Sequence, residues 1–127
     1  MCKRILLIEE DPCLRRKWKK FLEWERYQVT IADSKESAIH LMRDLLLEVD
    51  LIVVSIPKDC QDIRPKVAGL RECSSTSQIL LVVENSNDLG EVSYDILAKP
   101  FYPEQLVLRT KRLLCKPRES GQIGVNA

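Results

Sequence analysis

The sequence predicts a doubly wound α/β domain, in which a five-stranded parallel sheet carries helices on both faces. The first observation is that short apolar runs alternate with segments of helical periodicity along the chain. The second is that residues 51–54 read Leu-Ile-Val-Val, an uninterrupted branched run typical of a central parallel strand that is covered on both faces. The third is the length of 127 residues, which suffices for one domain with a single core.

Helical spacing and capping signals define the first two helices. Pro12 suits the first turn of a helix. Asp33 or Ser34 can cap the second helix, with Glu36 close enough for a box-like arrangement. The residues expected to face the core from these two helices are Leu14, Trp18, Phe21 and Leu22, followed by Ala38, Ile39, Leu41, Met42 and Leu45.

The remaining elements follow from apolar runs and from turn residues. The expected strands are residues 3–8, 27–32, 50–56, 79–83 and 95–98. A weaker helix is expected at residues 62–73, and Pro103 opens a last helix. Residues 84–93 are rich in Asn, Ser, Asp and Gly, so a fourth helix at that point should be shortened or absent. The domain is expected to cover residues 1–115, with residues 116–127 as a flexible tail or truncated linker.

Composition excludes several classes of protein. The net charge of +1 gives no bulk reason to expect a nucleic acid or an anionic membrane as partner. Five scattered cysteines and a single histidine form neither a C-x-x-C pair nor a zinc pattern, which favours reduced thiols in the cytoplasm. The apolar run after the N-terminus is too short for a signal peptide or a membrane span.

Three segments share their order and spacing with a known family. They are ILLIEEDP at residues 5–12, VDLIVVSIP at residues 49–57 and LAKPF at residues 97–101. Together they resemble the first, third and fifth strands of response-regulator receiver domains, the CheY-like domains of two-component signalling, and the resemblance extends over residues 3–115. It implies a flavodoxin-like sheet with the strand order 2-1-3-4-5.

The resemblance implies a phosphorylation site at the carboxyl ends of the strands. In the family, an acidic pair and an acceptor aspartate hold Mg²⁺, while a lysine neutralises charge on the phosphoryl group. The acidic pair corresponds to Glu9 and Glu10, both one methylene longer than the usual aspartates. Lys99 matches the lysine, and Pro100 matches a cis proline.

Other positions of the site depart from the family. The acceptor position holds Ser55, whose hydroxyl cannot form an acyl phosphate, and the Ser/Thr position holds Val83. The switch aromatic is replaced by Ile96. A shifted alignment does not supply an acceptor, because Asp50 lies at the start of the strand and Asp59 lies past the proline. These departures together indicate a pseudo-receiver that has lost its phosphoacceptor.

We therefore expect a non-enzymatic receiver that acts by protein–protein contact, with a histidine kinase or an effector domain as candidate partner. The resemblance implies a docking or homodimer face built from Ile96, Phe101, Tyr102 and the last helix. No cofactor is expected. Glu9 and Glu10 are vestigial metal candidates that leave weak Mg²⁺ binding open, although an ion pair between Lys99 and one of them is favoured.

Other readings of the sequence stay open. A receiver that accepts phosphate at a non-standard residue is the first. A nucleic-acid-binding module using the basic residues 15–20 is another, although such a run is usually a solvated helix face. An enzyme or nucleotide-binding domain would need a Gly-rich loop after the first strand, where the chain instead reads EEDPC. Ser55 has no histidine near it to act as a base, and a redox role for Cys13 and Cys60 has no independent support. The sequence does not reveal the partner, the pathway or the oligomeric state.

Overall fold

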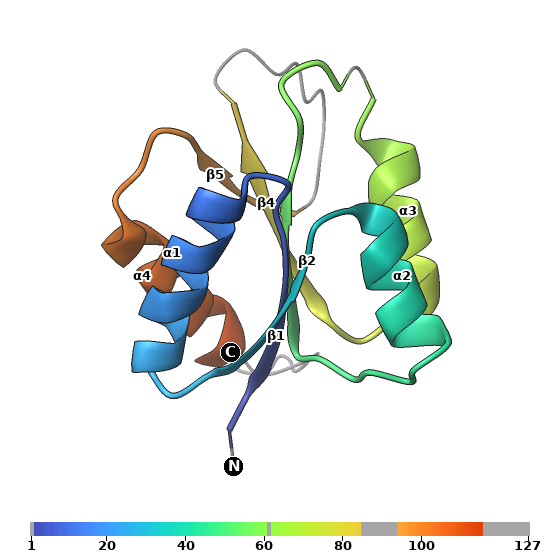
Figure 1. The fold of residues 1–127 in the computed structure, drawn as a ribbon, viewed down its shortest axis with the longest axis horizontal. Coiled ribbons are helices and arrows are strands. Elements are labelled where there is room, and N and C mark those ends of the chain that lie inside the picture. Colours follow the sequence, from blue (N-terminus) through green and yellow to red (C-terminus); the bar gives the residue numbers. More distant parts are fainter. Residues whose placement is uncertain (1, 61, 85–93, 116–127) are drawn as a thin grey trace, which may run out of the picture.

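The computed structural model describes residues 2–60, 62–84 and 94–115. Its centre is a sheet of five parallel strands in the order β2-β1-β3-β4-β5, as the sequence predicts (Figure 1). The strands are β1 (Arg4–Ile8), β2 (Gln28–Ala32), β3 (Leu51–Ser55), β4 (Gln78–Val83) and β5 (Asp95–Ala98). The three inner strands are buried on both faces, which explains their unbroken apolar runs.

Helices of the described ranges cover both faces of the sheet (Figure 1). They are α1 (Pro12–Trp24), α2 (Lys35–Arg43), α3 (Arg64–Cys73) and α4 (Pro103–Cys115). Helices α1 and α4 lie on one face, and α2 and α3 lie on the other. The segment between the fourth and fifth strands, where a helix was expected to be shortened or absent, and the tail expected after residue 115 fall on residues outside the described ranges.

The alternation of side chains along the strands divides the core into two clusters. Leu6 and Ile52 belong to the cluster under α2 and α3, whereas Ile5 and Leu51 belong to the cluster under α1 and α4. Successive residues of one strand therefore pack against helices on opposite faces of the sheet. No helix in the described part of the chain is long and apolar enough to cross a membrane.

The helix caps match the sequence pattern at both predicted N-termini. The Asp11 carboxylate accepts a hydrogen bond from the Cys13 backbone N–H at 2.8 Å and caps α1. Of the two candidate caps for α2, the residue in the cap position is Ser34, whose Oγ accepts from the Ser37 N–H at 3.1 Å. Asp33 lies one residue earlier, and its carboxylate accepts a hydrogen bond from the Ser37 hydroxyl.

The prediction that Leu45 faces the core from the second helix is wrong. Helix α2 ends at Arg43, and Leu45 is 61% exposed. The chain turns away there because Leu46 has a positive φ of 57°, and the Leu47 N–H bonds back to the Leu41 carbonyl at 3.0 Å. This is the usual geometry of a helix terminus closed by a left-handed residue.

Arg26, at the end of α1, also has a left-handed backbone, with φ of 71°. Because glycine adopts this conformation without steric cost, Arg26→Gly is expected to raise the free energy of unfolding by about 0.5–1 kcal/mol. The matched control is Arg16→Gly in the exposed helical interior of α1, which should lower it by about 1 kcal/mol. Urea denaturation measures both, and equal destabilisation by the two changes would contradict this reading of the backbone.

An ion pair joins the ends of the two helices on one face. Lys111 Nζ of α4 lies 2.8 Å from Glu25 Oε1, which follows α1. The hydrogen bond from this carboxylate raises the pKa of Lys111 above its ordinary value. On the same helix, Arg109 donates a hydrogen bond at 2.6 Å to the Ile96 carbonyl and so ties α4 to the edge strand β5.

Candidate functional site

Polar or charged residues lie at the carboxyl ends of the three inner strands and of the edge strand β5. Glu9 follows β1, Ser55 ends β3, Glu84 follows β4 and Lys99 follows β5. Carboxyl ends of parallel strands meet at one edge of a sheet, which is where open α/β sheets place their sites. Two of these residues, Glu84 and Lys99, come from strands that are distant in sequence from Glu9.

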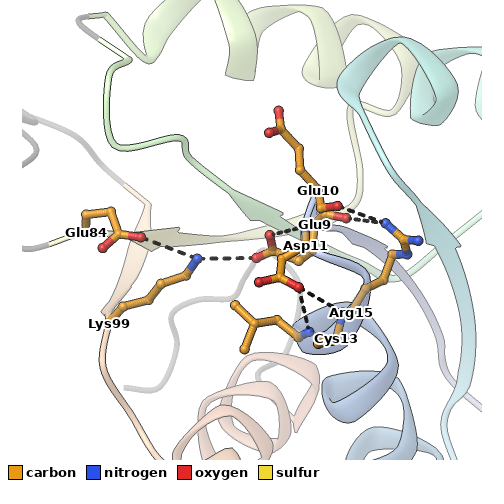
Figure 2. Close-up of polar contacts among 8 residues, drawn as sticks. Glu9, Glu10, Asp11, Cys13, Arg15, Glu84 and Lys99 are labelled. Atoms are coloured by element: carbon orange, nitrogen blue, oxygen red, sulfur yellow. Dashed lines mark hydrogen bonds and ion pairs between the residues drawn. The ribbon is translucent and has the colours of Figure 1, made fainter.

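Glu9 is the buried acidic residue of this edge, with 5% of its surface exposed. One carboxylate oxygen, Oε2, accepts a hydrogen bond from the Asp11 backbone N–H at 2.9 Å (Figure 2). The other, Oε1, lies 3.4 Å from Lys99 Nζ. The negative charge of Glu9 is therefore compensated inside the protein, as a buried charge requires.

Lys99 lies between two carboxylates. Its Nζ is 3.5 Å from Glu84 Oε2 on the side opposite Glu9 (Figure 2). The ammonium also lies 5.5 Å from the ring centroid of Trp18, within the range of a cation–π interaction. The ion pair with Glu9 confirms the interaction that the sequence favoured. The sequence places Glu84 directly after the fourth strand, at the same edge of the sheet, but does not indicate that it pairs with Lys99.

Glu10 does not join this cluster. Its side chain is exposed and points away from Glu9 in Figure 2. The backbone is fixed in this arrangement by Arg15, whose Nη1 donates to the Glu9 carbonyl at 2.8 Å and approaches the Glu10 carbonyl at 3.4 Å. No sequence pattern indicates this contact, because it depends on how α1 packs against the end of β1.

The donor set does not suit Mg²⁺, which takes several oxygen ligands in octahedral geometry. Glu9 is already paired with Lys99, and Glu10 lies apart from it. Within the described ranges, no group of three or more His, Cys, Asp or Glu residues could hold a metal ion. A cation at this edge would also meet the ammonium of Lys99.

The two other positions at this end of the sheet are neutral. Ser55 is half-buried and stands opposite Val82 in the strand register. Val83 is buried at 3% exposure, and its carbonyl accepts the Lys99 N–H at 2.7 Å. Asp50, by contrast, lies at the opposite end of β3, where its carboxylate accepts the Arg4 N–H at 2.8 Å. The structure therefore separates Asp50 from the site.

The bond between Lys99 and Pro100 is cis, as the resemblance implies. Phe101, which follows, stacks on Trp18 with ring centroids 5.3 Å apart. Ile96 packs into the cluster under α2 and α3, whereas Phe101 packs into the cluster under α1 and α4. Of the three residues expected on a docking face, Tyr102 is the strongly exposed one, at 76%.

The minor candidates lie outside this cluster. Cys13 is exposed on α1, and Cys60 is half-buried against the core under α2 and α3. His40 is exposed, and its Nδ1 lies 2.8 Å from Oδ2 of Asp44, the residue that follows α2. Asp59 is exposed in the loop after β3.

Comparison with known proteins gives similarity along most of the chain. No family model matches. The chain is 27% identical over 128 residues to the transcriptional regulatory protein ResD of Bacillus subtilis, covering 97% of this chain and 52% of that protein. It is 29% identical over 126 residues to the transcriptional regulatory protein CpxR of Escherichia coli, covering 94% of this chain and 52% of that protein. The chain thus spans about half the length of these relatives.

Solved structures share the fold. The receiver domain of the hybrid histidine kinase CckA superposes with a TM-score of 0.72 at 22% identity, covering 87% of this chain and 98% of that one. The chemotaxis protein CheY4 of Vibrio cholerae gives a TM-score of 0.72 at 19% identity, covering 90% of this chain and 100% of that one. At these identities the similarity establishes the architecture alone.

Proposed function

We propose that the chain, a receiver domain of the two-component response-regulator type, signals through protein contacts that do not depend on its phosphorylation. One observation carries the proposal: β3 ends in the neutral hydroxyl of Ser55, and the lysine at the same edge of the sheet, Lys99, is already compensated by Glu9 and Glu84. The cognate partner is a protein of a signalling pathway, such as a histidine kinase or an effector domain, and the proposed compartment is the cytoplasm.

The chemistry of phosphoryl transfer supports this proposal. A receiver takes the phosphoryl group on a carboxylate, and a metal ion and a lysine neutralise its charge. Ser55 contributes no charge to a metal. An incoming phosphoryl group would also face the carboxylates of Glu9 and Glu84, which flank the ammonium of Lys99. Because like charges repel, these carboxylates disfavour anion binding.

The proposal predicts that beryllofluoride or acetyl phosphate, each with Mg²⁺, leaves the amide NMR spectrum of the protein unchanged. A receiver that carries the acceptor aspartate is the reagent control. Saturable shifts centred on residues 9, 10 and 99 would contradict the proposal. Should phosphate be incorporated, its loss in Ser55→Ala would assign the acceptor to Ser55 and support the alternative of a non-standard phosphoacceptor.

A further inference from the structure

Part of the backbone of the edge strand β2 points its hydrogen-bonding groups away from the sheet. The Gln28 N–H donates to the carbonyl just before β1 at 2.9 Å, and the Ala32 carbonyl accepts the N–H of the residue just after β1 at 3.1 Å. Alternate residues of a parallel strand bond to the same neighbour, so Thr30 also faces β1. The N–H and C=O groups of Val29 and Ile31 therefore point outward, and no hydrogen bond joins them to the rest of the described chain.

The same strand lacks the features that usually keep a sheet edge from pairing. Natural edge strands commonly carry charged side chains, prolines or bulges. Residues 28–32 read Gln-Val-Thr-Ile-Ala, without a charge or a proline, and their register with β1 is unbroken. Valine, threonine and isoleucine are β-branched, which favours strand pairing. The apolar side chain of Ile31 is also 40% exposed. An uncharged strand with free donors and acceptors is thus open to a further strand.

The other edge strand, β5, is partly closed within the chain. The Lys99 N–H bonds to β4, so Ile96 is among the residues of β5 whose backbone points outward. Its outward carbonyl already accepts a hydrogen bond from Arg109 at 2.6 Å. The strand is four residues long and begins with the charged Asp95. Of the two edges, β2 is therefore the one suited to pairing with another strand.

We propose that β2 pairs with β2 of a second copy of this chain, antiparallel and about a two-fold axis at Thr30, so that the two sheets become one. This register places Val29 opposite Ile31 of the second copy. Both residues have outward N–H and C=O groups, so each such pair exchanges both of its hydrogen bonds. Thr30 then faces Thr30 of the second copy in a pair without hydrogen bonds. Because both copies use the same edge, the assembly closes at two.

Side chains and charges favour a second copy as the occupant of this edge. Val29 packs toward the cluster under α1 and α4, and Ile31, two residues later, lies on the same side of the strand. In the proposed register, Ile31 of each copy lies against Val29 of the other, and both are apolar and β-branched. The exposed Arg26 and Asp33 flank the strand at its two ends. An antiparallel arrangement brings Arg26 close to Asp33 of the second copy, so unlike charges meet at both ends.

The pairing is expected to be weak. Stable interfaces bury about 1,200–2,000 Å² in total, and a five-residue strand offers less than that, so we expect a dissociation constant on the order of 0.1–1 mM. This self-association goes beyond the proposed function, because it needs neither a phosphoryl donor nor a partner from a signalling pathway.

Sedimentation equilibrium of the full chain, at concentrations from about 0.02 to 2 mM, tests the proposal. The average mass is expected to rise from that of one chain toward that of two, and amide NMR shifts over the same range should centre on residues 28–32. Ile31→Pro removes an N–H that points outward and leaves the hydrogen bonds to β1 in place, a position where an edge strand tolerates proline. This variant should dimerise at least about tenfold more weakly.

A pair of charge variants tests the register. Thr30→Lys alone and Thr30→Glu alone should each stay monomeric, because like charges then face each other across the axis, whereas an equimolar mixture of the two should dimerise. Circular dichroism confirms that each variant is folded before it is measured.

The matched control, Tyr102→Lys/Leu108→Lys, changes two exposed apolar side chains beyond the other edge strand, 76% and 65% exposed, and should dimerise like the wild-type protein. Three results would each overturn the proposal. They are the mass of a single chain at every concentration, an Ile31→Pro variant that dimerises as well as the wild-type protein, and a mixture of the Thr30 variants that associates no better than either alone. Loss of the dimer in the control variant, with Ile31→Pro unaffected, would place the interface at α4 instead.

Discussion

Replacement of Lys99 by methionine is expected to lower the free energy of unfolding by about 2–4 kcal/mol, because it leaves the carboxylate of Glu9 buried without a cation. Glu9 is 5% exposed, and the Lys99 side chain is 18% exposed, so little water is present to replace the ammonium. Methionine keeps most of the apolar stem that packs near Trp18. Urea denaturation at neutral pH, followed by circular dichroism, measures the loss.

A double-mutant cycle separates the lost charge from lost packing. In Glu9→Gln/Lys99→Met, no buried carboxylate remains, so more than half of the lost stability should return. Lys20→Met removes an exposed lysine of α1 and should change stability by less than about 0.5 kcal/mol. A Lys99→Met variant as stable as the wild-type protein would mean that the buried ion pair contributes nothing to the end of the sheet.

The two tryptophans are expected to differ widely in how much stability the protein loses when each is replaced by alanine. Trp18 is 3% exposed, stacks on Phe101 and lies beneath the ammonium of Lys99. Trp18→Ala is therefore expected to cost about 3–5 kcal/mol, since it opens a cavity where α1 meets β5 and α4. Trp24 belongs to the same helix but is 72% exposed, so Trp24→Ala should cost less than about 1 kcal/mol.

Thermal and urea unfolding of the two variants give the comparison, with Trp18→Phe as a conservative intermediate. The phenylalanine variant keeps an aromatic partner for Phe101, so it should retain most of the stability that Trp18→Ala loses. A Trp24→Ala loss as large as that of Trp18→Ala would contradict the exposure of Trp24.

The ion pairs of Lys99 connect the ends of three strands. Lys99 draws together the ends of β1, β4 and β5 through Glu9, Glu84 and its own strand. The carboxylate of Glu84 thus supplies, within the chain, negative charge beside the lysine. The two charged contacts measure 3.4 and 3.5 Å.

The sequence by itself determined the order and kind of the elements. Apolar runs and helix-start signals such as Pro12 are local, so each strand and helix appears within a few residues of its predicted place. The three motifs also predict which residues lie at the carboxyl edge of the sheet, because each motif contains the end of a strand. Ser55, Glu9 and Lys99 lie at that edge for this reason.

Only the tertiary structure decided which of those residues meet. Glu9 turns to Lys99 while its neighbour Glu10 turns outward, and nothing in two consecutive glutamates distinguishes them. Ile96 and Phe101 separate onto opposite faces of the sheet, since side chains of a strand and of the loop that follows it need not share a layer. Such contacts join segments up to ninety residues apart, as Lys99 and Glu9 are, and their partners are set by packing and not by local sequence.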